Sequence, residues 1–440
     1  TLPGGVENLH ATIDYHYSGQ PEIITITNGP TVTNVYDANK LYRKTSKTVV
    51  QGSNTLSSFA YTYDNTNNIT QITEPGITKT YTYDDLYRLT QAVYTPTPGT
   101  PTTYTYAHNA IGNITNANGL AYTYSSAGKI NPHAVTTIGT SAYNYDVNGN
   151  MTSAPNLVIT NNWQNQPTRV VVGGATTIDT YYDENGERFI YKSPSKTEVQ
   201  VEEEYIVRNN VPEISIKLAG NLLGTIVNNV LYSSITDHLG TPIKQVDSAG
   251  AVVEDVSYDP FGKWAIQTST INTKRGYTGH EEDANTGLVY AEARYYSPGA
   301  IRCTRQDPSH VDVGHQAFSG MIGVERNAIL LDPQQLNSYS YVRNNPVNAV
   351  DPDGEKVELV SRPIGNFGGL QGRIAHKFFA HSFIKITPEN PQTVGSISGI
   401  DTNSVFTLGA TVNKGTLVKE ANGDYGYING CSGCASVVVN

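Results

Sequence analysis

Aromatic and polar residues alternate in short runs along this chain, and one such run keeps returning. Residues 81–90 read YTYDDLYRLT: a Tyr-x-Tyr triplet, a polar turn, then an apolar residue followed by Thr. In a strand this alternation puts both tyrosines on one face and the intervening threonine on the other. Related runs are YTYDNTNNIT (61–70), YTYAHNAIGNIT (104–115), YTYSSAGKI (122–130), YNYDVNGNMT (143–152) and the weaker YYDENGERF (181–189).

Each run predicts a β-hairpin, because Asp84-Asp85 and its counterparts favour a turn and Leu89-Thr90 opens a returning strand. The runs recur about every 20 residues, an interval typical of an array of similar units. Neighbouring hairpins would pair edge to edge into one long sheet, so few strand edges stay open. We interpret the tyrosines as packing residues rather than as carbohydrate platforms, with hydroxyls that reach a neighbour. The Pro/Thr-rich stretch 93–103 is expected to form a surface loop.

Composition supports an all-β protein and excludes several function classes. The chain has 30 Tyr but 9 Phe, and charged residues make up 15% of it, which suits strands better than helices. The net charge is -10 and there is no lysine-arginine block, so nucleic-acid binding is not expected. The sequence has no apolar run of membrane-spanning length, so we expect no membrane span. It begins at Thr1, which suggests a mature product or a piece of a longer protein, and we expect a secreted or cell-surface location.

Three longer motifs follow in the second half of the chain. Residues 236–264 read TDHLGTPIKQVDSAGAVVEDVSYDPFGKW; residues 275–308 read RGYTGHEEDANTGLVYAEARYYSPGAIRCTRQDP; residues 331–354 read LDPQQLNSYSYVRNNPVNAVDPDG. In this order they resemble the repeat-associated core of the Rhs/YD-repeat family, which includes polymorphic toxins and teneurin-like β-shells. The resemblance covers 236–354 and extends upstream, through the tyrosine repeats, to about residue 13.

The resemblance implies a spiralling β-sheet shell, closed at its C-terminal end by the core and followed by a variable effector segment. Some members cleave themselves just after the DPxGL motif with core aspartates, and the matching residues here are Asp307, Asp351 and Asp353. Two carboxyl groups that share a proton can activate water. However, Glu355 replaces the leucine, Ser297 replaces an aspartate of the usual RYYDP, and Asp-Pro is also ordinary turn chemistry. Cys303 is expected to be a small buried residue.

Beyond residue 354 the repeat tyrosines end, and residues 355–440 predict a small α+β module. Cys431 and His381 could act as the nucleophile and base of a thiol hydrolase, although the valine-rich end after Cys434 leaves little room for a helix. Four zinc ligands could also come from Cys431, Cys434, His376 and His381, but histidines and cysteines in this order are not a zinc signature. A solvated histidine and an inert cysteine pair are the third interpretation, and we predict no cofactor or metal.

We therefore predict three parts: a YD-repeat β-strip (1–235), an Rhs repeat-associated core (236–354) and a variable C-terminal domain (355–440). The predicted function is a secreted or cell-surface shell that encloses, delivers or displays its C-terminal effector, in competition between bacteria or in host contact. Two alternatives remain: a self-assembling filament or adhesin without toxin, and a C-terminal Cys-His hydrolase. Predicted partners are its own C-terminal domain, further copies of itself, or a secretion-machinery or cell-surface protein.

Overall fold

The computed structural model describes residues 10–124, 131–202, 204–218, 220–271, 273–308 and 333–355. It also describes the backbone of five short strands within 358–359, 410–413, 416–419, 425–428 and 434–438. Strands dominate the described residues, as the tyrosine and threonine alternation predicts, and most of them belong to two long antiparallel sheets.

The first sheet has 15 strands and takes in the N-terminal repeats. Its strands run in chain order from β13 back to β1, after which β37 and then β34 continue the edge. The members are β1 (His10–Tyr15), β2 (Pro21–Ile26), β3 (Thr31–Asp37), β4 (Arg43–Gln51), β5 (Asn54–Tyr63), β6 (Ile69–Glu74), β7 (Ile77–Tyr83), β8 (Leu89–Pro96), β9 (Thr102–His108), β10 (Ile114–Ala117), β11 (Leu120–Tyr124), β12 (Val135–Ile138), β13 (Ser141–Ala142), β34 (Ala410–Asn413) and β37 (Cys434–Val438).

The second sheet has 14 strands, again in chain order. It starts at β14, and only Tyr143 separates β14 from β13. The two sheets therefore form one strip with a break at Tyr143. The members are β14 (Asn144–Tyr145), β15 (Met151–Ala154), β16 (Leu157–Asn161), β17 (Pro167–Val172), β18 (Thr176–Tyr182), β19 (Arg188–Ser193), β20 (Lys196–Glu202), β21 (Tyr205–Arg208), β22 (Val211–Leu218), β23 (Asn221–Val227), β24 (Val230–Thr236), β25 (Pro242–Val246), β26 (Val252–Tyr258) and β27 (Trp264–Ser269).

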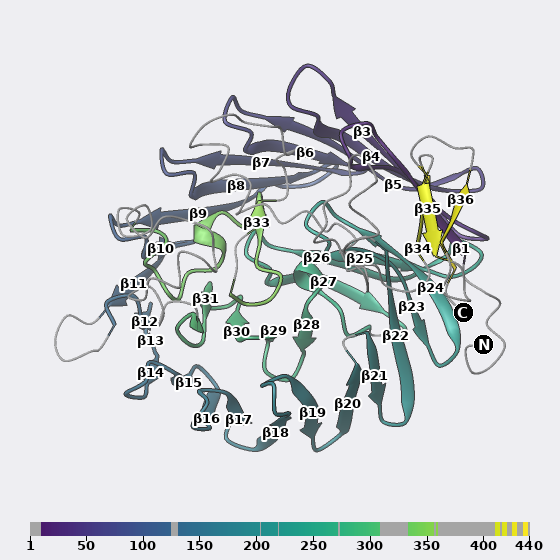
Figure 1. The fold of residues 1–440 in the computed structure, drawn as a ribbon. Helices are drawn as coiled ribbons and strands as arrows, with labels where there is room; N and C mark the ends of the chain where they lie inside the picture. Colours follow the sequence, from purple (N-terminus) through teal and green to yellow (C-terminus); the bar gives the residue numbers. More distant parts are fainter. Residues whose placement is uncertain are drawn as a thin grey trace.

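Short elements of the core motif lie between the two sheets (Figure 1). They are the 3-10 turns η1 (Tyr277–Gly279) and η3 (Val342–Asn344) and the strands β28 (Glu281–Asp283), β29 (Leu288–Ala291), β30 (Arg294–Ser297), β31 (Arg302–Cys303), β32 (Ala349–Val350) and β33 (Glu358–Leu359). β28 to β31 form a four-stranded sheet of their own, β32 pairs with β33, and β35 (Thr416–Lys419) pairs with β36 (Tyr425–Ile428).

A recurring aspartate shapes the hairpin turns. Asp84 Oδ1 accepts hydrogen bonds from the backbone N–H groups of Leu86 and Arg88, each at 3.0 Å, and Tyr87 adopts a left-handed φ of 63°. Where other repeats have glycine or asparagine at the left-handed position, the conformation costs less. The same pair of aspartate bonds forms at Asp64, Asp146, Asp183, Asp237 and Asp259. The DHLG and DPFG motifs are therefore further copies of the repeat turn.

After the turn, one extra residue enters the returning strand. Tyr83 pairs with Leu89 and Thr82 pairs with Gln91, so Thr90 is a bulge residue. A bulge strengthens the twist of a hairpin and bends it. The same shift recurs in the hairpins of Tyr63 and Tyr182, and repeated bulges of this kind help the strip to curve.

The tyrosines pack as predicted. Tyr81 is buried, the intervening Thr82 is exposed, and the Tyr83 hydroxyl donates to the carbonyl of Ile69 in the preceding repeat at 2.6 Å. Equivalent bonds join Tyr63 to the Lys44 carbonyl (2.5 Å) and Tyr182 to the Pro167 carbonyl (2.7 Å). In these repeats the second tyrosine thus fixes the hairpin to the strand before it, whereas in the described part of the chain the hydroxyls of Tyr106 and Tyr145 have no such partner.

The strip wraps around the core motif and its first strands pack against later ones. One apolar cluster joins Tyr81 and Leu89 of the first sheet, Ile178 of the second, and Tyr290 and Tyr295 of the core. Two smaller clusters connect the ends of the strip: Ile13 and Ile24 pack with Leu223, and Val49 packs with Ile235 and Val246. The concave side of the described strip is therefore filled by core side chains.

Asparagines and a tyrosine of the LNSYSYVRNNPV motif bind the repeat turns directly. Asn337 and Asn344 both donate to the Gly112 carbonyl at 2.9 Å, and the Tyr339 hydroxyl donates to the Gly149 carbonyl at 2.6 Å. Both glycines have left-handed φ values, of 78° and 83°. The motif therefore binds the repeat turns through hydrogen bonds to their backbone carbonyls.

One expectation needs correction, and another lies mostly beyond the described residues. The stretch 93–103 is not one loop, because β8 extends to Pro96 and β9 begins at Thr102, which leaves 97–101 as the connection. The alternation of valine, tyrosine and threonine there favours strand over the Pro-rich loop. In the tail the described residues are all in strands, and the predicted helical part falls outside them. In the part of the chain that the structure describes, no helix is long and apolar enough to span a membrane.

Candidate functional site

Two of the three predicted aspartates meet at one arginine inside the core. Arg294, the first residue of β30, binds Asp307 Oδ2 through Nη1 at 2.9 Å and Asp351 Oδ2 through Nη2 at 2.7 Å. Asp307 and Asp351 are 44 residues apart in sequence but share this guanidinium, and all three side chains are buried. A fork of parallel N–H groups is well suited to hold two carboxylates side by side.

Burial changes the acidity of this cluster. It raises the pKa of Asp351 to about 7, against the opposing effect of Arg294 and with a further increase from Asp307 and Asp353. The backbone carbonyl of Asp351 lies 2.7 Å from His280 Nε2, whose pKa burial lowers to about 4. Asp351 can therefore hold a proton near neutral pH beside a second carboxyl group, which is the arrangement of an acid-base pair.

Asp353 has a different role from the other two aspartates. Its Oδ1 accepts the Glu355 N–H at 3.1 Å, and its carbonyl accepts the Ala293 N–H at 3.2 Å. Gly354 follows with φ of 76°, and a Cβ there would lie 2.1 Å from the Ala291 carbonyl oxygen. The DPDG segment is thus seated on the turn between β29 and β30, where only glycine fits, and Asp353 shapes the backbone at residue 355.

The remaining predicted site residues divide as follows. Cys303 is buried and free, and burial raises the pKa of its thiol to about 11, which agrees with the expected inert residue. Cys431, His381 and His376 lie outside the described residues, and at Cys434 the structure describes the backbone alone, as the first residue of β37. Within the described ranges, no group of three or more His, Cys, Asp or Glu residues is placed to hold a metal ion.

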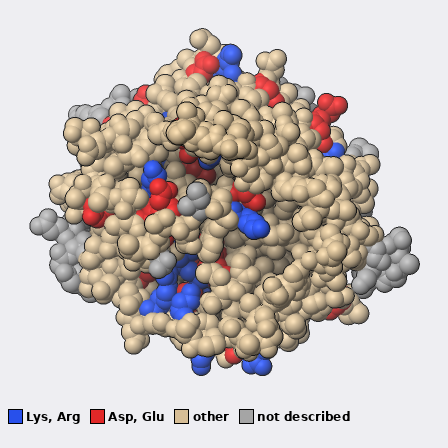
Figure 2. Space-filling model, turned by 180° about the vertical axis from the view of Figure 1, so that it is seen from behind, with Lys and Arg blue, Asp and Glu red and all other residues tan. Residues whose placement is uncertain are grey.

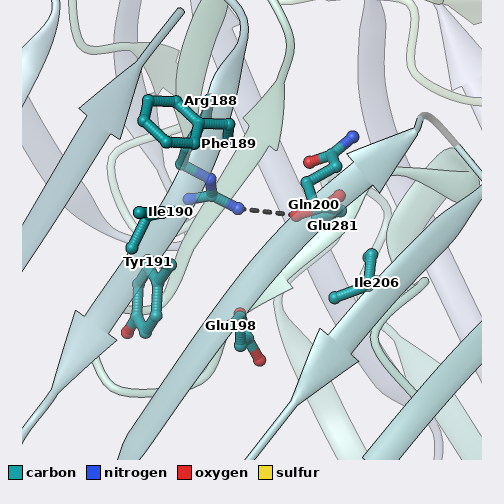
Figure 3. Close-up of a pocket in the computed structure, with 8 residues that line it drawn as sticks. All are labelled: Arg188, Phe189, Ile190, Tyr191, Glu198, Gln200, Ile206 and Glu281. Atoms are coloured by element: carbon teal, nitrogen blue, oxygen red, sulfur yellow. Dashed lines mark hydrogen bonds and ion pairs between the residues drawn. The ribbon is translucent and has the colours of Figure 1, made fainter. Parts of the chain in front are cut away.

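Sequence reasoning missed a second charged cluster, which joins the strip to the core. Arg188 opens β19, at the repeat position where other hairpins bury Ile69 or Leu89. Its Nη2 lies 2.7 Å from Glu281 Oε2 (Figure 3), and its Nη1 lies 2.6 Å from Asp283 Oδ2. Both carboxylates belong to β28, in the GHEED motif. The guanidinium also stacks over the Tyr290 ring, with 4.1 Å to the ring centroid.

Further charges extend this cluster into the second sheet. Lys274 Nζ bridges Asp283 Oδ1 at 2.8 Å and Glu198 Oε2 at 2.7 Å, and the Lys274 N–H donates to Glu213 Oε1 at 2.8 Å. Positive neighbours, led by Lys274, lower the pKa of Glu198 to about 2 against the effect of burial. We call the set Arg188, Glu198, Lys274, Glu281 and Asp283 the ionic latch. The one signal of this cluster in the sequence is Arg188, which stands at a repeat position where Ile69 and Leu89 are apolar.

The outer surface gives little sign of a charged binding face on the side shown in Figure 2. Most of that face carries neither basic nor acidic side chains, and a group of Lys and Arg side chains gathers in a depression in its lower half. Some charged side chains are instead buried, among them those of the aspartate cluster and the ionic latch.

Comparison with known proteins agrees with this architecture. Residues 131–347 match the teneurin YD-shell family. The chain is 29% identical over 245 residues to the tRNA3(Ser)-specific nuclease WapA of Bacillus spizizenii, which covers 51% of this chain and 10% of that protein. It is 31% identical over 134 residues to the toxin subunit YenC1 of Yersinia entomophaga, covering 29% of this chain and 12% of YenC1.

The fold also resembles a solved toxin assembly. The Tc holotoxin pore of Photorhabdus luminescens superposes with a TM-score of 0.62 and 21% identity, over 81% of this chain and 19% of that one. The chain therefore spans about a tenth of the length of these two curated relatives and a fifth of the structural one.

Proposed function

We propose that this chain, whose residues 131–347 match the teneurin YD-shell family, closes one end of a toxin-delivery shell. In this role it encloses, delivers or displays the polypeptide that follows residue 354, in competition between bacteria or in contact with a host. The observation that carries the proposal is the seat of the DPDG segment, which fixes the start of the tail against the core inside the strip.

The packed interior refines this role. Core side chains fill the concave side of the described strip, so a cargo of tail size requires further repeats, which the much longer relatives have room for. The names of those relatives, a nuclease and a toxin subunit, support an effector as cargo. Secretion or a cell-surface location follows from such a role, with a secretion-machinery or cell-surface protein as partner.

Negative-stain imaging of the purified chain together with its intact mass tests the proposal. We expect compact, monomeric particles, and a tail that harms bacteria when it is expressed alone in the cytosol. Long fibres that grow with protein concentration would instead favour the filament alternative, in which free sheet edges pair between copies. A harmless tail on a compact shell would remove the effector part of the proposal.

We further propose that Asp307 and Asp351 are a catalytic pair for self-cleavage just after the DPDG segment. The carboxylate of Asp307 takes a proton from water. The protonated carboxyl group of Asp351 donates its proton to the carbonyl oxygen of the scissile peptide. The water oxygen bonds to the carbonyl carbon. The proton taken from water then passes to the leaving nitrogen as the C–N bond breaks, and a hydroxyl of the intermediate returns a proton to Asp351, which gives a carboxyl group and an amine. Arg294 holds both carboxyl groups, and Asp353 positions the backbone through its hydrogen bond to Glu355.

Intact mass also tests this second proposal. Wild-type protein should lose the tail mass, whereas Asp351→Asn and Asp307→Asn should retain it. Asp255→Asn, at an exposed aspartate of β26, is the matched control and should cleave as wild type does. If wild type stays intact, Glu355→Leu shows whether the glutamate is the cause, and an intact Leu variant would refute the catalytic pair.

A further inference from the structure

A small cavity lies between the two sheets, away from the aspartate cluster and the ionic latch. It has a volume of about 60 Å³ and is bounded by β2, β3 and β4 on one side and by β23 and β24 on the other. Its apolar walls include Ile24, Val49 and Leu223. Its polar lining includes Asn34, Lys44, Lys47, Asp237 and His238. Such a volume holds a few water molecules or one small ion.

A bulge brings both lysines to this cavity. Residues three apart on a regular strand point to opposite faces. In β4, however, Ser46 pairs with Val35 and Lys44 pairs with Tyr36, so Thr45 is an extra residue. This insertion reverses the alternation once, and Lys44 and Lys47 therefore share the face that looks across at β24.

The two lysines form no ion pair in the described part of the chain, although the charge of Asp237, which also lines the cavity, partly offsets the effect of burial on the pKa of both. Among the described residues, neither ammonium group has a carboxylate oxygen within 4.0 Å. Lys47 Nζ donates to the carbonyl and hydroxyl oxygens of Thr236, at 2.6 and 2.9 Å. Burial lowers the pKa of Lys44 to about 8 and that of Lys47 to about 7, the latter with a contribution from Lys44 itself.

The other polar groups of the cavity are largely committed to local structure. Asp237 Oδ1 accepts the N–H groups of Leu239 and Thr241 in its turn. His238 Nε2 donates to the Val347 carbonyl at 2.7 Å, and burial lowers the pKa of its ring. Asn34 is buried and its Nδ2 donates to the Pro21 carbonyl, while its Oδ1 lacks a donor.

We propose that this cavity binds a small oxyanion that carries a hydroxyl group, of the hydrogen-phosphate or hydrogen-carbonate type. Lys44 and Lys47 supply the positive charge, and the anion's O–H donates to Asn34 Oδ1. The small volume of the cavity fits a free small anion rather than a lipid headgroup or a polynucleotide phosphate. Bound there, it ties β4 of the first sheet to β24 of the second and stabilises the closure of the strip.

Competitive labelling of amines in the intact chain tests the site. Trace acetic anhydride reacts with neutral amines, and peptide mapping gives the relative rate at each lysine. With inorganic phosphate at ten times its dissociation constant, the rates at Lys44 and Lys47 should fall about tenfold, because only the unoccupied fraction reacts. Exposed Lys192 serves as the internal control and should keep its rate. Sulfate, which has no hydroxyl donor at neutral pH, should protect more weakly.

A variant separates specific binding from a general salt effect. Lys44→Met keeps the bond from Lys47 to Thr236 and should abolish phosphate protection of Lys47, whereas Lys192→Met should leave it unchanged. Equal protection by phosphate in the Lys44→Met variant, or no protection in wild type, would overturn the proposal. Because the readout is local, it also distinguishes failure of the site from failure of the shell function.

Discussion

The ionic latch gives the sharpest test of how the core is held in the strip. Arg188→Met removes the charge and keeps a long apolar side chain at a position where other repeats bury isoleucine or leucine. In the native protein Arg188 lies 2.7 Å from Glu281 and 2.6 Å from Asp283. In the variant both carboxylates stay buried, and Lys274 is their remaining cation. Breaking a buried ion pair on one side typically costs about 3–5 kcal/mol.

At about 2.1 cal/mol/K per residue, unfolding this 440-residue chain changes the entropy by roughly 0.9 kcal/mol/K, so 1 kcal/mol shifts the thermal midpoint by about 1 °C and a loss of roughly 3–5 °C is expected. Differential scanning calorimetry measures it, and a double-mutant cycle with Asp283→Asn isolates the pair. The double variant should lose less than the sum of the two single losses, because the partner left behind is then neutral.

The matched control is Arg169→Met, which removes the exposed ion pair between Arg169 and Asp179 in the same sheet. It should leave the thermal midpoint unchanged within error, since exposed pairs contribute little. If Arg188→Met behaves like this control, or if the cycle is additive, the latch does not hold the core and the reasoning fails.

Three further predictions follow from the turn and the aspartate cluster. Tyr83→Phe loses the bond to Ile69 and leaves Asn348 without its 3.0 Å contact to the hydroxyl, so denaturant unfolding should show a loss of about 1–2 kcal/mol. Gly354→Ala should speed limited proteolysis after residue 354 far more than Gly52→Ala, whose added Cβ meets nothing within 4 Å. Asp351→Asn should flatten the pH dependence of stability. Between the unfolded pKa near 4 and the folded pKa of about 7, native Asp351 binds more protons than unfolded Asp351, so wild-type stability falls as pH rises, by at most about 1.4 kcal/mol per unit.

Local chemistry explains why the sequence predicts the hairpins so well. Alternation fixes which face of a strand Tyr81, Thr82 and Tyr83 occupy, and the aspartate after the triplet satisfies its turn within five residues. Both effects act over short distances. The pairing of consecutive hairpins is supported in several repeats by a tyrosine hydroxyl that reaches a carbonyl of the preceding strand.

The sites depend on contacts that no local pattern encodes. The motif order indicated Asp307 and Asp351 as candidates, but their shared partner Arg294 emerges only when β30 packs beside the DPDG segment. Regular strand alternation would place Lys44 and Lys47 on opposite faces, and a single bulge at Thr45 brings them to the same face. Arg188 meets its partners across more than 90 residues.

The choice of arginine at position 188 is better explained by specificity than by stability. Buried apolar residues already satisfy the equivalent position in several repeats, and burying a guanidinium with two carboxylates costs desolvation energy that the pairing only offsets. An apolar residue would accept any apolar segment of the core. Arg188 accepts one that presents carboxylates at the spacing of Glu281 and Asp283, which fixes β28 against β19. β29 and β30 belong to the same small sheet as β28, so fixing β28 also positions them. Arg294 is in β30, and the turn between β29 and β30 forms the seat of Gly354. The latch thus links the position of β28 to that of the seat of Gly354, although the two lie at different ends of the motif.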